Sequence, residues 1–298
     1  MNLTVRAEEL GDDLRRLREQ TGLSLERAGE LIDASATKMS RIENGLREGS
    51  PEDVAALLAI YRCVGPRRAE LLALAHEFER RGWWQRNKPD FAERVRTLIN
   101  LENKADLIVN FEGMNIPGLL QTGEYTRALL RESGLVPDSE VEHRMVIRMQ
   151  RHALLLKPKP PKLLAIIDEL ALHRMVGGDD VMRRQLDYLD DAAKQSNIDL
   201  RIVPNSGGHA GANGAFALFR RANGHKAVYL ENLTSVLILE EDHEITRYEQ
   251  AIRLLVRRAL PAQESILLIN KLARRLDPEA TQGELAEEQL QRHGGELR

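Results

Sequence analysis

Short apolar segments at helical spacing, separated by turn residues, fill the first 80 residues of the chain. Leu10, Leu14 and Leu17 follow the i, i+4, i+7 pattern of a first helix, and Gly22 interrupts it. No segment in this region alternates apolar and polar residues as a strand does. The pattern predicts a compact, all-helical N-terminal domain.

Four more helices are expected, because each has a recognisable start or stop. Ser24 and Ser35 can cap the second and third helices, since a serine hydroxyl accepts a hydrogen bond from a first-turn amide. Gly45 suits the left-handed position that ends the third helix. Ser50-Pro51 begins a fourth helix, and Gly65-Pro66 precedes a fifth. The first domain is therefore predicted to be a bundle of five helices.

After Pro89 the pattern changes to a mixture of helices and strands. Helical periodicity occurs around residues 91–105, 123–131, 140–155, 181–195, 245–259 and 266–276. Apolar runs of strand length occur at residues 163–167, 199–203, 215–219, 227–230 and 235–239. The fold class predicted is α+β: a five-helix bundle at residues 1–81, then a mixed α/β domain with about five short strands at 82–276. The polar composition of residues 277–298 predicts a flexible tail.

Composition is that of an ordinary globular protein, with 42% apolar and 30% charged residues among 298. The one cysteine, Cys63, cannot form a disulfide within the chain and fits a reducing compartment. The N-terminus lacks the apolar core of a signal peptide, and no window approaches the ~20 apolar residues that span a bilayer. We therefore expect a cytoplasmic protein that does not enter a membrane.

The third predicted helix has two chemically different faces. At 100° per residue, Met39 and Ile42 fall on one side, whereas Thr37, Arg41 and Asn44 fall on the other. The segment from Ser24 to Gly45 therefore has the layout of a helix-turn-helix, with a tight connection between two short helices. Net charge is only −3, so binding to nucleic acid would depend on a local surface of this kind.

The residue types on the polar face suit a DNA major groove. Arg41 can donate two hydrogen bonds to guanine, Thr37 can contact a base edge or a thymine methyl, and Lys38 can reach guanine or phosphate. The helix starts at Ser24 and Ser35 can offer backbone amides to phosphates. Our candidate base contacts are Ala36, Thr37, Lys38, Ser40 and Arg41, and our candidate phosphate contacts are Ser24, Ser35, Asn44 and Arg47.

Residues 23–45, ending in SATKMSRIENG, resemble the XRE-type helix-turn-helix of phage repressors and their bacterial relatives, a lambda-repressor-like fold. The resemblance implies that Ala36, Thr37, Lys38 and Arg41 face bases and that Ser24, Ser35 and Asn44 face phosphates. It also implies an ion pair between Arg18 and Glu43. Four residues depart from the family pattern, namely Leu25, Ala28, Gly29 and Asp33.

A basic stripe is the best candidate surface in the second domain. Arg144, Arg148 and Arg151 fall at i, i+4, i+7 in a stretch without acids that runs from His143 to Ile167. Three interpretations remain open: a solvated stripe, a cradle for an acidic partner protein, or contact with the DNA backbone.

The second domain also resembles the C-terminal domain of antitoxin-like regulators that are abundant in actinomycete bacteria. The resemblance rests on several short segments: Gly82-Trp83-Trp84, 117–122, 168–174, Gly177-Gly178 and 203–219. It implies a regulator paired with a small acidic protein from a neighbouring gene, with this domain acting as the docking or sensing module.

No catalytic or cofactor site is indicated by the remaining motifs. The glycine-rich segment 207–214 lacks the Gly-Lys-Ser/Thr ending of a phosphate loop, and helix starts explain Asp168 and Glu169 better than catalysis does. The histidines lack metal-ligand spacing. We expect a non-enzymatic, DNA-binding transcription regulator without a cofactor, and a homodimer, because two-fold operators suit two-fold proteins. The alternatives are an enzyme that its helix-turn-helix targets to DNA, and a module that binds protein.

Overall fold

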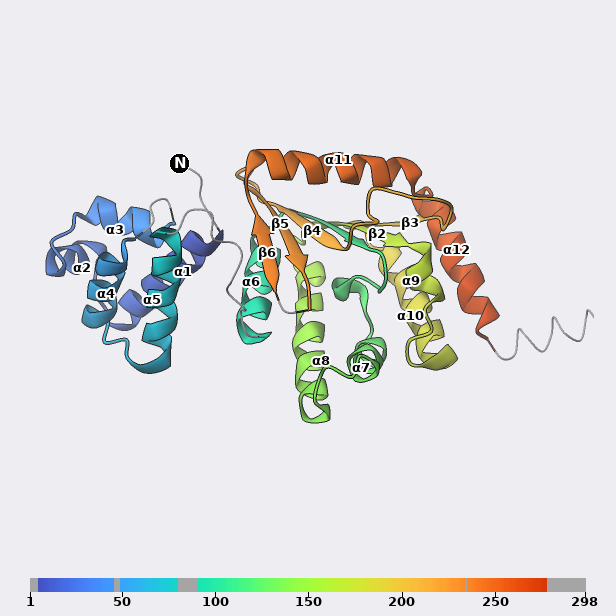
Figure 1. Ribbon diagram of the computed structural model, residues 1–298, viewed down its shortest axis with the longest axis horizontal. Coiled ribbons are helices and arrows are strands. Elements are labelled where there is room, and N and C mark those ends of the chain that lie inside the picture. The colour runs from blue at the N-terminus through green and yellow to red at the C-terminus, as the bar shows by residue number, and fades with distance from the viewer. Residues whose placement is uncertain (1–4, 46–48, 80–90, 234, 278–298) are drawn as a thin grey trace, which may run out of the picture. The chain divides into compact units, whose positions relative to one another are not determined.

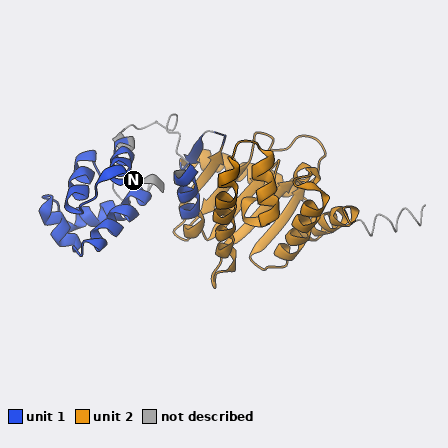
Figure 2. Cartoon of the chain, turned by 90° about the horizontal axis from the view of Figure 1, so that it is seen from below, with its two compact units in different colours: residues 1–101, 232–240 blue, residues 102–231, 241–298 orange. Residues whose placement is uncertain are grey.

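The computed structural model describes residues 5–45, 49–79, 91–233 and 235–277. The chain divides into two compact units, residues 1–101 with 232–240 and residues 102–231 with 241–298 (Figure 2). The expected boundary near Gly82 lies outside the described residues, as does the expected tail beyond Asp277.

The first unit contains the five predicted helices. They are α1 (Val5–Gln20), α2 (Leu25–Leu31), α3 (Ala36–Glu43), α4 (Pro51–Ile60) and α5 (Gly65–Glu79). Ser24, Ser35 and Ser50 cap α2, α3 and α4, each accepting a hydrogen bond from the amide three residues later. The apolar stripes of the helices meet in one buried cluster that includes Leu10, Leu14, Met39, Ile42, Val54, Leu57, Leu58 and Leu71.

A six-stranded mixed sheet organises the rest of the chain. Its strands are β1 (Leu107–Glu112), β2 (Lys162–Asp168), β3 (Ile198–Val203), β4 (Phe216–Arg220), β5 (Lys226–Glu231) and β6 (Val236–Leu239), in the order β3-β2-β1-β4-β5-β6. The first three are parallel, whereas β4 is antiparallel to β1 and β5 to β4. Phe111 of β1 pairs with Ile166 on one side and Phe216 on the other. The predicted α+β class is therefore confirmed.

Helices cover both faces of this sheet. In Figure 1, α11 (Asp242–Arg258) crosses one face, where it contacts β3 and β5, while α7, α8 and α10 lie on the other. The remaining bounds are α6 (Phe91–Lys104), η1 (Gly118–Leu120), α7 (Gly123–Glu132), α8 (Asp138–His152), η2 (Ala153–Leu156), α9 (Glu169–His173), α10 (Gly178–Ala193) and α12 (Ala262–Arg275). Because both faces are covered, β2 is apolar from Leu163 to Ile167, and all of these residues except Leu164 are buried.

One strand was not predicted. The sequence pattern indicates no strand at residues 107–112, yet β1 lies in the middle of the sheet between β2 and β4. Its apolar run is short and is interrupted by Asn110, whose side chain donates to the carbonyl of Phe216 at 3.2 Å. The pairing of β1 with two distant strands decides its conformation, and this pairing leaves no local signal.

Candidate nucleic-acid interface

The third helix is held on the bundle by its apolar side and exposes its polar side. Met39 and Ile42 are fully buried, whereas Thr37 and Arg41 are exposed. Within the described ranges, neither of these two exposed side chains has a hydrogen-bond or ion-pair partner. The arrangement agrees with the two-faced helix that the sequence predicts, and it leaves Thr37 and Arg41 available for an external ligand.

A buried ion pair links this helix to α1. The Arg18 guanidinium donates to both carboxylate oxygens of Glu43, at 2.7 and 2.9 Å, and to the carbonyl of Leu23 at 2.9 Å. The two side chains are only 11% and 2% exposed. Hydrogen bonding to Glu43 raises the pKa of Arg18. Because each charge is compensated and bound at two points, the pair fixes the orientation of α3 relative to α1.

Arg15 makes a second link between α1 and α3, which the sequence analysis did not identify. Its guanidinium donates to the carbonyl of Glu43 at 2.8 Å and to Oδ1 of Asn44 at 2.6 Å. Asn44 in turn donates to the backbone carbonyl of Ser40 at 2.7 Å and to its hydroxyl at 3.2 Å. The Asn44 amide, expected to contact phosphate, is therefore used inside the unit. Arg15 precedes Arg18 by three residues and therefore lies on the same face of α1. This spacing is the feature of the sequence that could have identified Arg15 as a second contact to α3.

Lys38 is held differently from its exposed neighbours. Its Nζ lies 2.7 Å from Oδ1 of Asp53 in the first turn of α4, and the two side chains are 28% and 20% exposed. Ala36 is half-buried in the first turn of α3, and the hydroxyls of Ser24 and Ser35 act as helix caps. Arg47, the remaining predicted contact, lies outside the described residues.

The three arginines of α8, for which the sequence leaves a solvated stripe, a partner cradle and DNA backbone contact open, do not form an open basic stripe. Arg151 donates to both oxygens of Glu102, at 2.9 and 2.6 Å, with its side chain only 12% exposed. Arg148 donates to Oε1 of Gln121 at 2.8 Å, and Arg144 to Glu140 at 2.6 Å. Two of the three guanidinium groups, those of Arg148 and Arg151, thus bond to polar groups inside the unit. Such pairing is expected, because burying a charge without a partner costs free energy. They do not form an open cradle for an acidic protein.

Glu112, at the end of β1, is the most perturbed carboxyl near these arginines. Burial raises the pKa of Glu112 to about 7, although a hydrogen bond from Asn110 and the charge of Arg148 act in the opposite direction. Burial also lowers the pKa of Arg148. No sequence motif marks this carboxyl, because its burial depends on how distant parts of the chain fold together.

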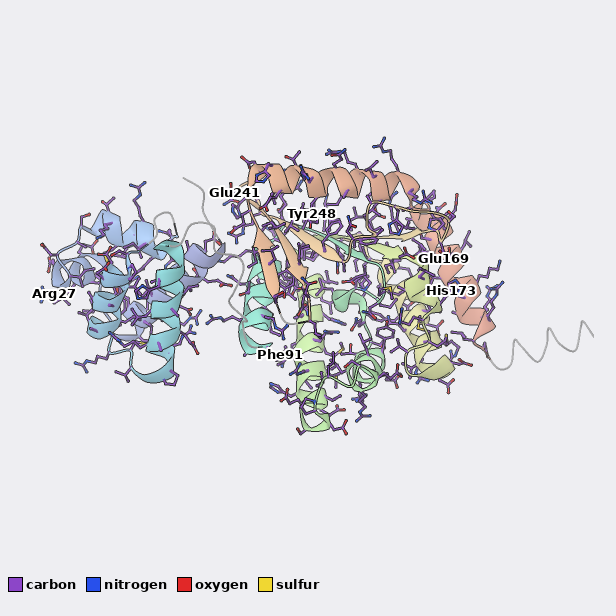
Figure 3. The ribbon with its side chains drawn as sticks, in the orientation of Figure 1. Arg27, Phe91, Glu169, His173, Glu241 and Tyr248 are labelled. Atoms are coloured by element: carbon purple, nitrogen blue, oxygen red, sulfur yellow. The ribbon has the colours of Figure 1, made fainter. Side chains whose placement is uncertain are left out.

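The glycine-rich segment between β3 and β4 is a loop anchored at the ends of the parallel strands. His209 Nε2 lies 2.7 Å from Asp168, and its Nδ1 accepts from the amide of Gly211 at 3.1 Å. Glu169 accepts from the amide of Asn205 at 2.8 Å and lies beside His173 (Figure 3). Since both ring nitrogens of His209 are occupied, this arrangement holds the loop and offers no free base. Across the described residues, no group of three or more His, Cys, Asp or Glu side chains could hold a metal.

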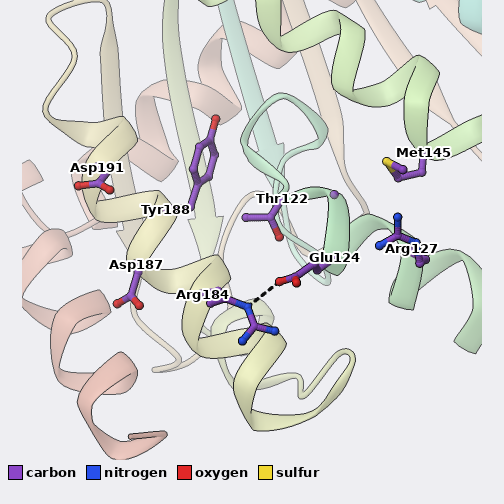
Figure 4. A pocket seen from close by; sticks show the side chains of 9 residues that line it. Thr122, Glu124, Arg127, Met145, Arg184, Asp187, Tyr188 and Asp191 are labelled. Atoms are coloured by element: carbon purple, nitrogen blue, oxygen red, sulfur yellow. Dashed lines mark hydrogen bonds and ion pairs between the residues drawn. The ribbon is translucent and has the colours of Figure 1, made fainter. Parts of the chain in front are cut away.

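An open groove of about 530 Å³ lies between α7, α8 and α10 (Figure 4). Glu124 and Arg184 form an ion pair of 2.6 Å along its edge, and Tyr188 contributes an aromatic wall. The lining residues are Thr122, Gly123, Glu124, Arg127, Met145, Arg184, Asp187, Tyr188 and Asp191. The groove is a surface recess whose edge carries this ion pair.

Two family models match the chain, one in its N-terminal part and one over most of the remainder. Residues 95–271, more than half of the chain, match a domain of unknown function, DUF5753. The chain belongs to the DUF5753 family. In this DUF5753 protein, residues 9–71 also match a helix-turn-helix domain, a range that runs from within α1 to the start of α5. No curated protein and no solved structure matches the chain. Among the described helices, none combines the length and apolar composition needed to cross a bilayer. The helix-turn-helix match, together with the exposed face of α3, indicates a DNA-binding regulator.

Proposed function

We propose that this DUF5753 protein is a sequence-specific transcription regulator whose α3 enters the DNA major groove. The observation that carries the proposal is the exposed pair Thr37 and Arg41, which have no partner within the described residues and lie on a helix whose other face is buried. Helix-turn-helix proteins read bases with side chains near the start of their second helix. Polar groups on this face also favour DNA over a protein partner, which would require apolar anchors.

Base reading and backbone contact are divided among the residues of α2 and α3. We assign base contacts to Thr37, Ser40 and Arg41, with Ala36 in position to meet a thymine methyl. The starts of α2 and α3 at Ser24 and Ser35 supply backbone contacts through their first-turn amides. The protein acts as a homodimer on two half-sites, in the manner of XRE-type regulators.

The second unit is the regulatory part in this proposal. It docks a small acidic protein or senses a ligand, as in antitoxin-like regulators of actinomycetes, and the protein works in the cytoplasm without catalysing a reaction. Because Arg148 and Arg151 bond to Gln121 and Glu102, docking takes place elsewhere on this unit. The anchoring role of His209 and Asp168 supports the absence of catalysis, since the imidazole has no free nitrogen.

Replacing Arg41 tests the proposal. A bidentate arginine–guanine contact contributes about 1–3 kcal/mol of discrimination. Arg41→Ala should therefore lose most of the preference for the cognate promoter over a scrambled duplex in a gel-shift titration, with an unchanged circular dichroism spectrum.

Arg16→Ala provides the matched control, because it removes the same charge from α1 at a side chain that is 66% exposed. This variant should keep the preference for the cognate promoter. Full discrimination by Arg41→Ala would contradict the assignment of α3 as the reading helix.

A further inference from the structure

Lys38 and Asp53 form a contact that bears directly on how the first unit meets DNA. Lys38 belongs to the first turn of α3, between the exposed Thr37 and the buried Met39. Its ammonium is nevertheless turned to Asp53 on α4, at 2.7 Å. Arg41, one turn later, has no such partner within the described part of the chain. The two cations of this helix are therefore in different states before DNA arrives.

Three features stabilise the carboxylate that holds Lys38. Asp53 lies in the first turn of α4, where the helix dipole favours a negative charge. Its amide donates to the hydroxyl of Ser50 at 3.1 Å, which fixes the backbone from which the carboxylate projects. About three-quarters of each partner's surface is covered, so salt screens this pair less than an exposed pair. Release of Lys38 would leave a partly buried carboxylate without a counter-charge.

We infer that Asp53 withholds the Lys38 ammonium from DNA, so that Lys38 neutralises no phosphate and reads no base in the complex. Asp53 thereby limits the affinity for DNA of any sequence and its dependence on salt, without touching the DNA. Phosphate contacts strengthen binding to every sequence, whereas base contacts favour one. Keeping one cation away from the backbone lowers binding to every DNA sequence alike, while discrimination is left to Thr37, Ser40 and Arg41.

This inference rests on the proposed function, because it concerns the same DNA-facing helix. It also replaces the expectation from the sequence that Lys38 contacts bases. The distinguishing quantity is the dependence of affinity on salt, since each neutralised phosphate adds about 0.9 to the slope of log K against log salt concentration.

The experiment compares full-length variants on two probes: a duplex enriched from a random pool by the wild-type protein, and a scrambled duplex of the same composition. Asp53→Asn should steepen the salt slope by about 0.9 on both probes and strengthen binding to both, leaving the ratio of specific to non-specific affinity unchanged. The double variant Asp53→Asn with Lys38→Met should return to the wild-type slope, because the added contact belongs to Lys38. Lys38→Met alone should also keep that slope.

Glu52→Gln is the matched control, since it removes one negative charge from the same helix turn without a contact to Lys38. Its slope should equal that of the wild type, and circular dichroism should show every variant folded. An unchanged slope for Asp53→Asn, or a slope lowered by about 0.9 for Lys38→Met alone, would overturn the inference while leaving the proposed function intact. If the wild-type protein enriched no sequence at all, the proposed function would fail and the inference with it.

Discussion

Glu112 illustrates how the surroundings of one side chain change its chemistry. Its carboxyl is attached to the last residue of a central strand, where burial disfavours the charged form and raises the pKa to about 7 from an ordinary 4.5. The nearby Arg148 opposes this shift without cancelling it. The folded protein therefore holds a proton on Glu112 over a pH range in which the unfolded chain has lost it.

The resulting pH dependence of stability has a definite sign. Between pH 4.5 and about 7 the folded state binds more protons than the unfolded state, so stability falls as pH rises through this window. The full effect of such a shift is about 3 kcal/mol. Glu112→Gln carries no titrating group, so its melting temperature should rise relative to that of the wild type across the window.

Thermal melts at either end of this pH range measure the difference. Glu264→Gln, which removes a carboxyl from an exposed position of α12, is the comparison variant measured over the same pH range. A difference between Glu112→Gln and the wild type that stays constant with pH would show that Glu112 titrates at its ordinary value.

Spacing along the chain predicted which residues share a helix face but not where that face is directed. The i, i+4, i+7 spacing of Arg144, Arg148 and Arg151 places the three residues on one side of α8. The direction of the stripe depends on Glu102, which is 49 residues away from Arg151 in the sequence. Polar partners from distant elements leave no periodic signal, and the same holds for the contact of Arg15 with Asn44.

Among the elements, α1 packs closely against the end of α3 at Gly11. A Cβ atom placed on Gly11 would lie 2.7 Å from the backbone carbonyl oxygens of both Ile42 and Glu43. Backbone atoms cannot move aside as a flexible side chain can. Glycine at this position is therefore what allows α1 to reach the end of α3.

Gly11→Ala should destabilise the first unit by about 1–3 kcal/mol, because overpacking forces the two helices apart. The same displacement should weaken DNA discrimination, since α3 would tilt relative to the bundle. Chemical denaturation monitored by circular dichroism gives the stability, and gel shift gives the discrimination. Gly208→Ala is the control, because a Cβ there meets nothing within 4 Å. Equal stability of Gly11→Ala and the wild type would show that the helices adjust without cost.

Local signals explain why the helices were easier to predict than the sheet. Ser24, Ser35 and Ser50 cap helices in the structure as the sequence indicates, because a cap and its helix are adjacent in the chain. Strand β1 depends instead on β2 and β4, whose paired residues lie 55 and more than 100 positions later. A short apolar run beside a helix carries too little local information to predict such a strand.

On the scale of the whole molecule, a weak overall charge limits how tightly one copy can hold DNA. The chain carries 43 basic and 46 acidic residues, so attraction to phosphates would depend on a local basic surface and not on the net charge. Because Lys38 is paired with Asp53, Arg41 is the cation of α3 that has no partner within the described residues. One such helix covers a single half-site. Two copies on one duplex would double the contacts and multiply the specificity.

The operator should therefore be an inverted repeat. For a two-fold dimer of helix-turn-helix units, the half-sites should be separated by about 34 Å, one turn of DNA, or by a multiple of that length. Genome-wide mapping of bound DNA followed by footprinting measures both the symmetry and the spacing. Disruption of one half-site should weaken binding much more than the loss of its own contacts explains, because it also removes the second copy. A single asymmetric site that binds one chain with full affinity would contradict the dimer while leaving the reading role of α3 in place.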